Sequence, residues 1–164
     1  MSYREREVSM NIFPLGPSGG PGGGSFNDIA DKLGGFTGLA FTASIAALQV
    51  NAGDTLDHLI VTYTENIGSV QHGASNGGAA FPAFVLGLPG EKLTQVHGWL
   101  GTFSGTLEVQ GFNFVTNTGR QSGVLGKTTD LPFEFFAPAN GEIMAFWGRE
   151  GLFFDACGVF VRVP

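Results

Sequence analysis

The chain has 164 residues, a formal net charge of −6 and 13% charged residues, about half of the ~25% that soluble domains usually carry. This length suits a single domain that buries most of its apolar surface. Its eight Lys and Arg residues form no cluster beyond Arg4 and Arg6. Because phosphate binding needs clustered basic side chains, nucleic acid is excluded as a partner. The 27 glycines and 16 phenylalanines favour an all-β protein with many tight turns over a helical bundle.

The chain divides into an N-terminal extension at residues 1–11 and one domain at residues 12–164. The extension is charged and lacks the apolar core of a secretory signal. No apolar stretch approaches the ~20 residues of a membrane span. We therefore expect a cytoplasmic protein without membrane insertion; unconventional export leaves no mark in a sequence and stays open. The glycine-rich segment 16–24, called the glycine loop below, has the composition of a flexible linker or of a loop whose bare backbone approaches a ligand closely.

Strand-like runs separated by Gly, Pro and Asn turns fill the rest of the chain. Expected strands lie at residues 42–50, 57–65, 80–86, 92–100, 104–116, 131–136, 141–148 and 155–163. Only residues 27–33 and 42–49 have patterns compatible with a helix, and the second pattern is equally compatible with a strand. Many short strands at even spacing indicate antiparallel sheets in a sandwich, barrel or prism.

A glycine-flanked turn recurs at intervals of about 50 residues, as Gly53–Asp57, Gly101–Gly105 and Gly151–Asp155. Each copy is followed by a strand of alternating pattern. Self-similarity of this kind is typical of one supersecondary unit used several times. Three copies favour a prism, with three sheets around a pseudo-threefold axis. The first and last copies keep an aspartate at the same place, which indicates a binding site made more than once.

Catalysis is not supported by the motifs that first suggest it. Gly73–Gly77 matches the Gly-X-Ser-X-Gly elbow of serine hydrolases, but no helical pattern follows it and only His97 comes later as a base. Asp57 and Asp155 belong to different repeats, so we expect them to lie farther apart than the ~5–10 Å that glycosidic cleavage requires. The sequence therefore predicts binding without turnover.

No metal or cofactor is expected either. The three histidines, His58, His72 and His97, lie in separate segments without the paired spacing of a metal site. Asp54 and Asp57 share one turn, but a turn of this length supplies too few oxygens for calcium, which takes six to eight.

The repeated turn has the chemistry to bind vicinal hydroxyls. An ionised aspartate accepts two strong, charge-assisted hydrogen bonds. The backbone N–H groups of the turn are donors, and glycine keeps the approach to them open. Each sugar hydroxyl is both a donor and an acceptor, so it matches this combination. An aspartate in a tight turn is equally typical of a structural Asx-turn, but two copies at equivalent positions favour a site.

Taken together, these features resemble the jacalin-related lectins over about residues 12–163. The resemblance is carried by the glycine loop, Gly53–Asp57 with its following strand, Gly77-Gly78, Gly90-Glu91, Phe112–Asn117 and Gly148–Val159. No single piece is specific, whereas their order and spacing are. The resemblance implies a β-prism I fold of three antiparallel Greek-key sheets with pseudo-threefold symmetry, and a lectin without catalytic activity.

The family's binding residues carry over onto two loops. The resemblance implies a first site made of Gly23, Gly151, Leu152, Phe153 and Asp155. Within it, Leu152 and Phe153 would donate backbone N–H groups and Asp155 would accept from sugar hydroxyls. It implies a second site made of Asp54, Thr55, Asp57 and Gly78, as in banana lectin. The third repeat has Gly105 where an aspartate would be required, so no comparable site is expected there.

The galactose-binding branch of the family is cleaved in the glycine loop, whereas this chain continues through it. The resemblance therefore implies mannose- or glucose-containing glycans as partners. Ser18 and Pro21 replace an aromatic residue and an asparagine that are common in this loop, and Pro21 has no N–H to offer. Because one shallow site binds weakly, a homo-oligomer, a dimer or higher, is expected. The alternative is a β-prism protein-interaction or stress module without sugar binding.

Overall fold

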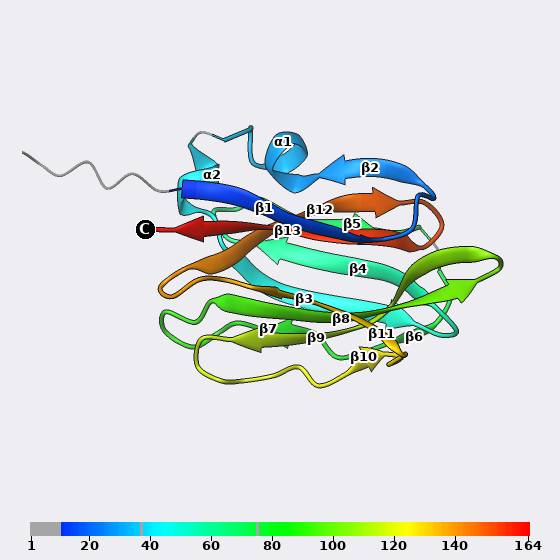
Figure 1. Ribbon diagram of the computed structural model, residues 1–164. Coiled ribbons are helices and arrows are strands. Elements are labelled where there is room, and N and C mark those ends of the chain that lie inside the picture. The colour runs from blue at the N-terminus through cyan, green and yellow to red at the C-terminus, as the bar shows by residue number, and fades with distance from the viewer. Residues whose placement is uncertain (1–10, 37, 75) are drawn as a thin grey trace, which may run out of the picture.

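Three antiparallel sheets make up almost the whole fold, and two short helices cover one edge (Figure 1). The computed structural model describes residues 11–36, 38–74 and 76–164. The expected extension at residues 1–11 therefore lies outside the described residues, except Asn11. The arrangement confirms the predicted all-β prism.

Each sheet is built around one long antiparallel hairpin. Sheet A has the order β1 (Asn11–Gly19), β13 (Phe154–Val163), β12 (Glu142–Glu150) and β2 (Gly24–Asn27). Sheet B has the order β5 (Gly68–His72), β4 (Leu56–Tyr63), β3 (Ile45–Ala52) and β6 (Ala79–Ala80), with β7 (Phe84–Val85) also paired to β3. Sheet C has the order β10 (Leu125–Gly126), β9 (Thr106–Thr116), β8 (Leu93–Phe103) and β11 (Leu131–Phe136).

Several segments differ from the sequence-based expectation, and strands β2, β5 and β10 lie where no strand was predicted. The predicted helix near 27–33 is present as α1 (Asp28–Lys32), but the ambiguous segment 42–49 divides into α2 (Leu39–Thr42) and strand β3. The glycine loop is neither a linker nor wholly a loop, because β1 runs through its first part and pairs with β13. Neither helix is long and apolar enough to cross a membrane.

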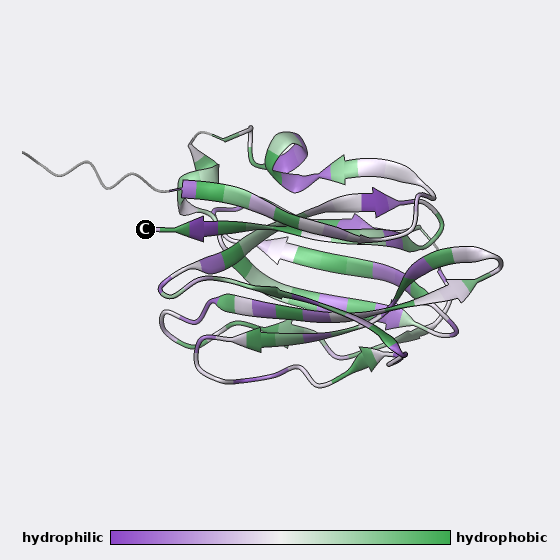
Figure 2. Cartoon of the chain, in the orientation of Figure 1, coloured by the Kyte–Doolittle hydropathy of each residue, from purple (hydrophilic) through white to green (hydrophobic). Residues whose placement is uncertain are grey.

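The core lies between the three sheets and is dominated by phenylalanine. The largest fully buried rings are Phe112, Phe114, Phe146 and Phe154. Phe112 stacks on Phe114 with ring centroids 5.1 Å apart and meets Phe154 edge-on at 5.9 Å, which joins sheet C to sheet A. Hydrophobic and polar residues alternate along several strands (Figure 2), so each sheet turns one face to this core.

A β-bulge at the same end of each long hairpin follows the pseudo-threefold symmetry. Each of the three long hairpins has two register shifts, and the one nearer the glycine turn leaves one residue of the second strand unpaired. At this shift the unpaired residues are Asp57, Gln110 and Asp155. The expectation that Gly105 takes the aspartate position is therefore wrong. The β8–β9 hairpin continues past its bulge, so its Gly101–Gly105 turn lies farther along the hairpin. The residue equivalent to the two aspartates is Gln110, whose side chain is an amide.

A glycine faces each bulge from a neighbouring segment. These glycines are Gly19, Gly73 and Gly126, and all have positive φ. In each case an added Cβ would lie 2.2–2.4 Å from the carbonyl oxygen of the bulged residue. No side chain fits there, so the close approach of bare backbone is a repeated constraint of this fold.

The glycine at position 98, in strand β8, tests the packing away from the bulges. A Cβ added to Gly98 would lie 2.1 Å from Cζ of the buried Phe133 ring, whereas one added to Gly87 meets nothing nearer than 3.8 Å. Gly98→Ala should therefore lower the free energy of unfolding by about 2 kcal/mol through overpacking. Gly87→Ala, the matched control, should change it by less than about 0.5 kcal/mol. Urea denaturation of both variants measures the difference, and equal midpoints would contradict the packing described here.

Candidate functional site

The first site forms where the glycine loop meets the turn between β12 and β13. A Cβ added to Gly22 would lie 2.4 Å from Oδ1 of Asp155, and one added to Gly23 would lie 2.6 Å from Oδ2. Gly151 lies beside Gly23, because a Cβ added to Gly151 would lie 3.5 Å from Cα of Gly23. The structure thus brings Gly23, Gly151 and Asp155 together, as the resemblance implied. Bare backbone surrounds the carboxylate on two sides.

Leu152 and Phe153 form the tip of the same turn. The turn is closed by Gly151 N–H, which donates to the carbonyl oxygen of Phe153 at 3.0 Å. Leu152 is 69% exposed. The Phe153 ring packs edge-on against Phe103 with centroids 5.2 Å apart. Phe103 lies at the end of the β8–β9 hairpin, which reaches beyond the neighbouring turns (Figure 1), so this hairpin forms a wall beside the first site.

The second site repeats this geometry in sheet B. A Cβ added to Gly78 would lie 2.3 Å from Oδ2 of Asp57, and one added to Gly53 would lie 3.9 Å from the same oxygen. Asp57 and Asp155 are both 5% exposed, so each carboxylate lies at the bottom of a glycine-walled cradle. The glycines opposite each carboxylate leave the space beside its oxygens without side chains.

The other two residues expected at the second site differ in position. Thr55 is buried, and its hydroxyl donates to Oε2 of Glu108 at 2.9 Å, so only its backbone faces the turn. Asp54 is exposed at the rim and pairs with Lys127 Nζ at 3.1 Å. Ser75 of the Gly-X-Ser-X-Gly match lies outside the described residues.

Comparison with known proteins identifies this arrangement. Residues 15–160 match the jacalin-like lectin domain. The chain belongs to the jacalin-like lectin family. Its match covers both cradles and all three sheets, in agreement with the observed prism.

Several relatives share this domain over most of the chain. Horcolin from Hordeum vulgare is 29% identical over 152 residues, which make up 90% of this chain and 94% of horcolin. An agglutinin from Castanea crenata is 28% identical over 156 residues, 92% of this chain, but the match spans only 46% of the agglutinin. Myrosinase-binding protein 2 from Arabidopsis thaliana is 28% identical over 158 residues, 96% of this chain and 22% of that protein.

Solved structures give the same result. A mannose-specific jacalin-related lectin from Morus nigra, in complex with mannose, is 27% identical with a TM-score of 0.75, and the match covers 93% of this chain and 95% of that one. Malaysian banana lectin is 26% identical with a TM-score of 0.73, covering 92% of this chain and 98% of that one. The fold class predicted from the sequence is thereby confirmed.

Arg149 shapes the glycine loop of this lectin and was not predicted from the sequence. Its Nε donates to the carbonyl oxygens of Pro21 and Gly22 at 3.1 and 2.9 Å, and its Nη2 donates to that of Gly23 at 2.7 Å. Burial raises the pKa of Asp155, and the positive charge of Arg149 partly opposes that rise. A lone arginine just before the Gly151 turn, in a chain with so few charges, was the available signal.

Glu108 is a third carboxylate at the same end of the prism. It is buried, and the pKa of Glu108 is raised first by that burial, against the hydrogen bond from Thr55, and further by the negative charges of Asp155 and Asp57. The two cradles therefore lie close enough to share an electrostatic neighbour. The Thr55 hydroxyl donates to Glu108 Oε2 at 2.9 Å, so this carboxylate is engaged within the protein.

A buried ion-pair network around His72 fixes the turn of the first site. His72 is 3% exposed, and its Nε2 lies 2.9 Å from Oδ1 of Asp28 while its Nδ1 lies 2.8 Å from Oε2 of Glu150. Gly73 N–H also donates to that Glu150 oxygen, at 3.0 Å. Phe26 stacks on the imidazole with centroids 3.8 Å apart. Since Glu150 immediately precedes the Gly151 turn, the network joins the end of β5 to the first site.

Both ring nitrogens of His72 face carboxylates, so both donate and the ring is charged. Burial by itself would lower the pKa of His72. Hydrogen bonds and negative charge from Asp28 and Glu150 outweigh burial and raise the pKa to about 9. Among the described residues, no three His, Cys, Asp or Glu side chains are grouped as metal ligands. The contacts of His72 with Asp28 and Glu150 support the turn that follows Glu150.

This raised pKa makes stability depend on pH in a definite direction. Because the pKa of His72 is about 9 in the folded protein and about 6.5 when unfolded, the stabilisation is complete below pH 6.5 and is lost as pH rises through 9. His72→Gln should remove this dependence and cost about 3 kcal/mol, because it leaves buried carboxylates without their counter-ion. Denaturant unfolding between these pH values measures both effects.

His97→Gln is the matched control, since His97 is partly exposed and its Nδ1 lies 3.8 Å from Glu134. It should retain the pH dependence of the unaltered protein. An unchanged slope in His72→Gln would show that another group titrates in this range.

Proposed function

We propose that this chain is a non-catalytic lectin that binds mannose- or glucose-type glycans through two sites. The observation that carries the proposal is the duplicated cradle, in which Asp155 and Asp57 each lie against two glycines of neighbouring turns. A structural Asx-turn would need no bare backbone facing its carboxylate. Two such cradles at equivalent bulges favour a common ligand.

The chemistry of the cradle suits neighbouring hydroxyls of a hexose. The carboxylate accepts one hydrogen bond at each oxygen, and charge-assisted bonds of this kind are the strong ones. In the first site the backbone N–H groups of Leu152 and Phe153 are the proposed donors. In the second site the backbone around Thr55 takes the same part, with Gly78 as the opposing wall. Asp54 contributes from the rim.

The relatives support this ligand class. The similar Morus nigra lectin is described as mannose-specific and was solved with mannose, and a similar artocarpin structure holds mannotriose. Catalysis is disfavoured because glycoside hydrolysis needs two carboxyl groups that flank the ligand. The nearby Glu108 is 4% exposed and is engaged by Thr55, so each cradle presents one carboxylate.

A single shallow site of this kind binds weakly, with a dissociation constant of about 1 mM, or roughly −4 kcal/mol. Two sites on one protomer raise the effective affinity for a branched glycan, and a homo-oligomer raises it further. The proposal therefore includes self-association as the source of useful avidity.

Titration calorimetry with methyl α-mannopyranoside tests the proposal directly. Asp155→Asn should weaken the first site at least tenfold, because hydrogen bonds to a charged acceptor contribute about 1.5–3 kcal/mol. The Asp57→Asn, Asp155→Asn double variant should lose the binding contributed by both cradles while keeping its circular dichroism spectrum. Asp130→Asn, which removes an exposed carboxylate outside both cradles, is the matched control and should bind normally. Full affinity in the folded double variant would refute the assignment.

The raised pKa of Asp155 adds a prediction about pH. Only the ionised carboxylate accepts charge-assisted hydrogen bonds at both oxygens, so affinity at the first site should decline on acidification. Because burial raises this pKa, the decline should begin at a higher pH than an ordinary aspartate would give. The Asp57→Asn variant removes the second cradle, and sugar titrations of it across the acidic range follow the first. Affinity that is independent of pH until the protein unfolds would contradict this role of Asp155.

The alternative function is a protein-interaction module that keeps the prism without sugar binding. It is favoured by the relative named myrosinase-binding protein 2 and by Leu152, whose 69% exposed side chain stands at the tip of the first site. A folded protein that binds no glycan on an array, yet binds a protein partner through the Leu152 turn, would favour this function.

A further inference from the structure

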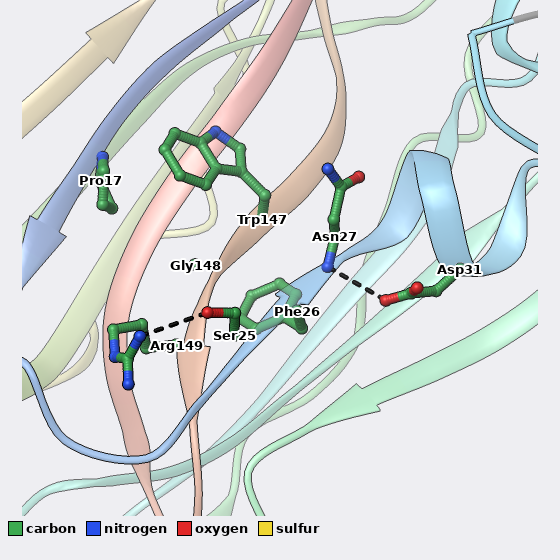
Figure 3. Close-up of a pocket in the computed structure, with 8 residues that line it drawn as sticks. All are labelled: Pro17, Ser25, Phe26, Asn27, Asp31, Trp147, Gly148 and Arg149. Carbon is green, nitrogen blue, oxygen red and sulfur yellow. Dashed lines mark hydrogen bonds between the residues drawn. The ribbon is translucent and has the colours of Figure 1, made fainter.

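A groove on sheet A lies outside both cradles and has the composition of a binding site. It has a volume of about 390 Å³. Figure 3 shows its lining residues, which are Pro17, Ser25, Phe26, Asn27, Asp31, Trp147, Gly148 and Arg149. They come from strands β1, β2 and β12 and from helix α1. None of the residues assigned to the two cradles is among them.

Trp147 forms a fixed aromatic wall of this groove. Its Nε1 donates to the carbonyl oxygen of Val159 at 3.1 Å, which satisfies the only polar atom of the ring. The ring also lies directly on Gly158, since a Cβ added there would lie 2.5 Å from Trp147 Cε2. Held by bare backbone beneath it and by this hydrogen bond, the indole loses little freedom when a ligand stacks on it.

Hydrogen-bond donors and acceptors surround the indole of Trp147. Asp31 accepts from the backbone N–H of Asn27 through Oδ2 at 3.2 Å, and no residue in the described part of the chain bonds to its other oxygen. Asn27 uses its side-chain oxygen to accept from Ala30 N–H at 3.0 Å, which leaves its amide nitrogen as a donor. Ser25 adds a hydroxyl, which accepts from Arg149 Nη1 at 3.2 Å.

The charge of the groove narrows the ligand class. Asp31 and Arg149 are its two charged lining residues, and their opposite signs balance. Asp31 would repel an anion and Arg149 would repel a cation, so a neutral ligand is favoured. A flat indole buries an apolar face, while the amide, hydroxyl and carboxylate fit a ligand whose edge both donates and accepts.

A pyranose combines these properties, because its C–H groups form an apolar face and its hydroxyls form a hydrogen-bonding edge. We propose that this groove is a third carbohydrate site, in which Trp147 stacks on the sugar ring and Asp31 and Asn27 bind its hydroxyls. The site goes beyond the two cradles proposed above. Arg149 connects them, because it lines the groove and also holds the carbonyl groups of the glycine loop.

Intrinsic fluorescence tests the groove separately from the cradles. The chain has two tryptophans, so Trp99→Phe leaves Trp147 as the only indole. Adding Asp57→Asn and Asp155→Asn silences both cradles. Titration of this triple variant with methyl α-mannopyranoside, methyl α-glucopyranoside and mannotriose should change the Trp147 emission in a saturable way with at least one sugar.

Asp31→Asn in the same background should weaken that response about tenfold, since it removes the charged acceptor and keeps the shape of the side chain. Asp130→Asn is the matched control and should leave the response unaltered. No saturable change with any of the three sugars, or a response of equal affinity with Asp31→Asn, would overturn the proposal. Emission that depends on protein concentration and is indifferent to sugar would assign the groove to a second copy of the chain, and would also overturn it.

Failure of the groove proposal can be distinguished from failure of the two-cradle proposal. Calorimetry on the single-site variants reports on the cradles, whereas Trp147 emission in the triple variant reports on the groove. A saturable response there, together with unaltered calorimetry in Asp155→Asn, would support the groove and reject the first cradle. The reverse pattern would reject the groove alone.

Discussion

The close approach of bare glycine backbone to a bulged strand is the constraint on which the binding end of this prism depends. At Gly19, Gly73 and Gly126 an added Cβ would lie within 2.2–2.4 Å of a carbonyl oxygen. These contacts bring three separate segments against the three hairpins at the same end. In the two repeats with an aspartate at the bulge, further glycines continue along the carboxylate and form a cradle. The third repeat lacks both features, because Gln110 occupies its bulge and residues 127–131 contain no glycine.

Around these cradles the chain uses its few charges as supports. Arg149 binds three carbonyl oxygens of the glycine loop, and His72 lies between Asp28 and Glu150 behind the adjacent turn. A glycine loop has high conformational entropy when free, so a site built from it needs such partners to be preorganised. Buried ion pairs contribute little net stability on average. Their contribution here is better understood as geometric, since each one positions a turn that carries an aspartate.

The sequence predicted much of the fold and of the site because the relevant signals are local. The Gly-X-X-X-Asp turns, the alternating strands that follow them and the glycine count all reflect neighbours in the chain. The helix near Asp28 also followed from local pattern, since Asn27 caps it through Ala30 N–H. The strand β1 was missed because its glycines and prolines disfavour a strand, and pairing with β13 overrides that preference. The position of Gln110 was missed because a bulge depends on the register between two strands.

The sequence by itself therefore determined the all-β prism, its threefold repetition and the two aspartates of the cradles, which are properties of short segments and their spacing. Only the tertiary structure decided which residues meet across long separations. Arg149 contacts Pro21, Gly22 and Gly23 more than a hundred residues away in the chain, His72 bridges Asp28 and Glu150, and Trp147 lies on Gly158 beside Asp31. The physical reason is that contacts between sheets depend on how strands pack and shift in register, and no spacing along one strand encodes that.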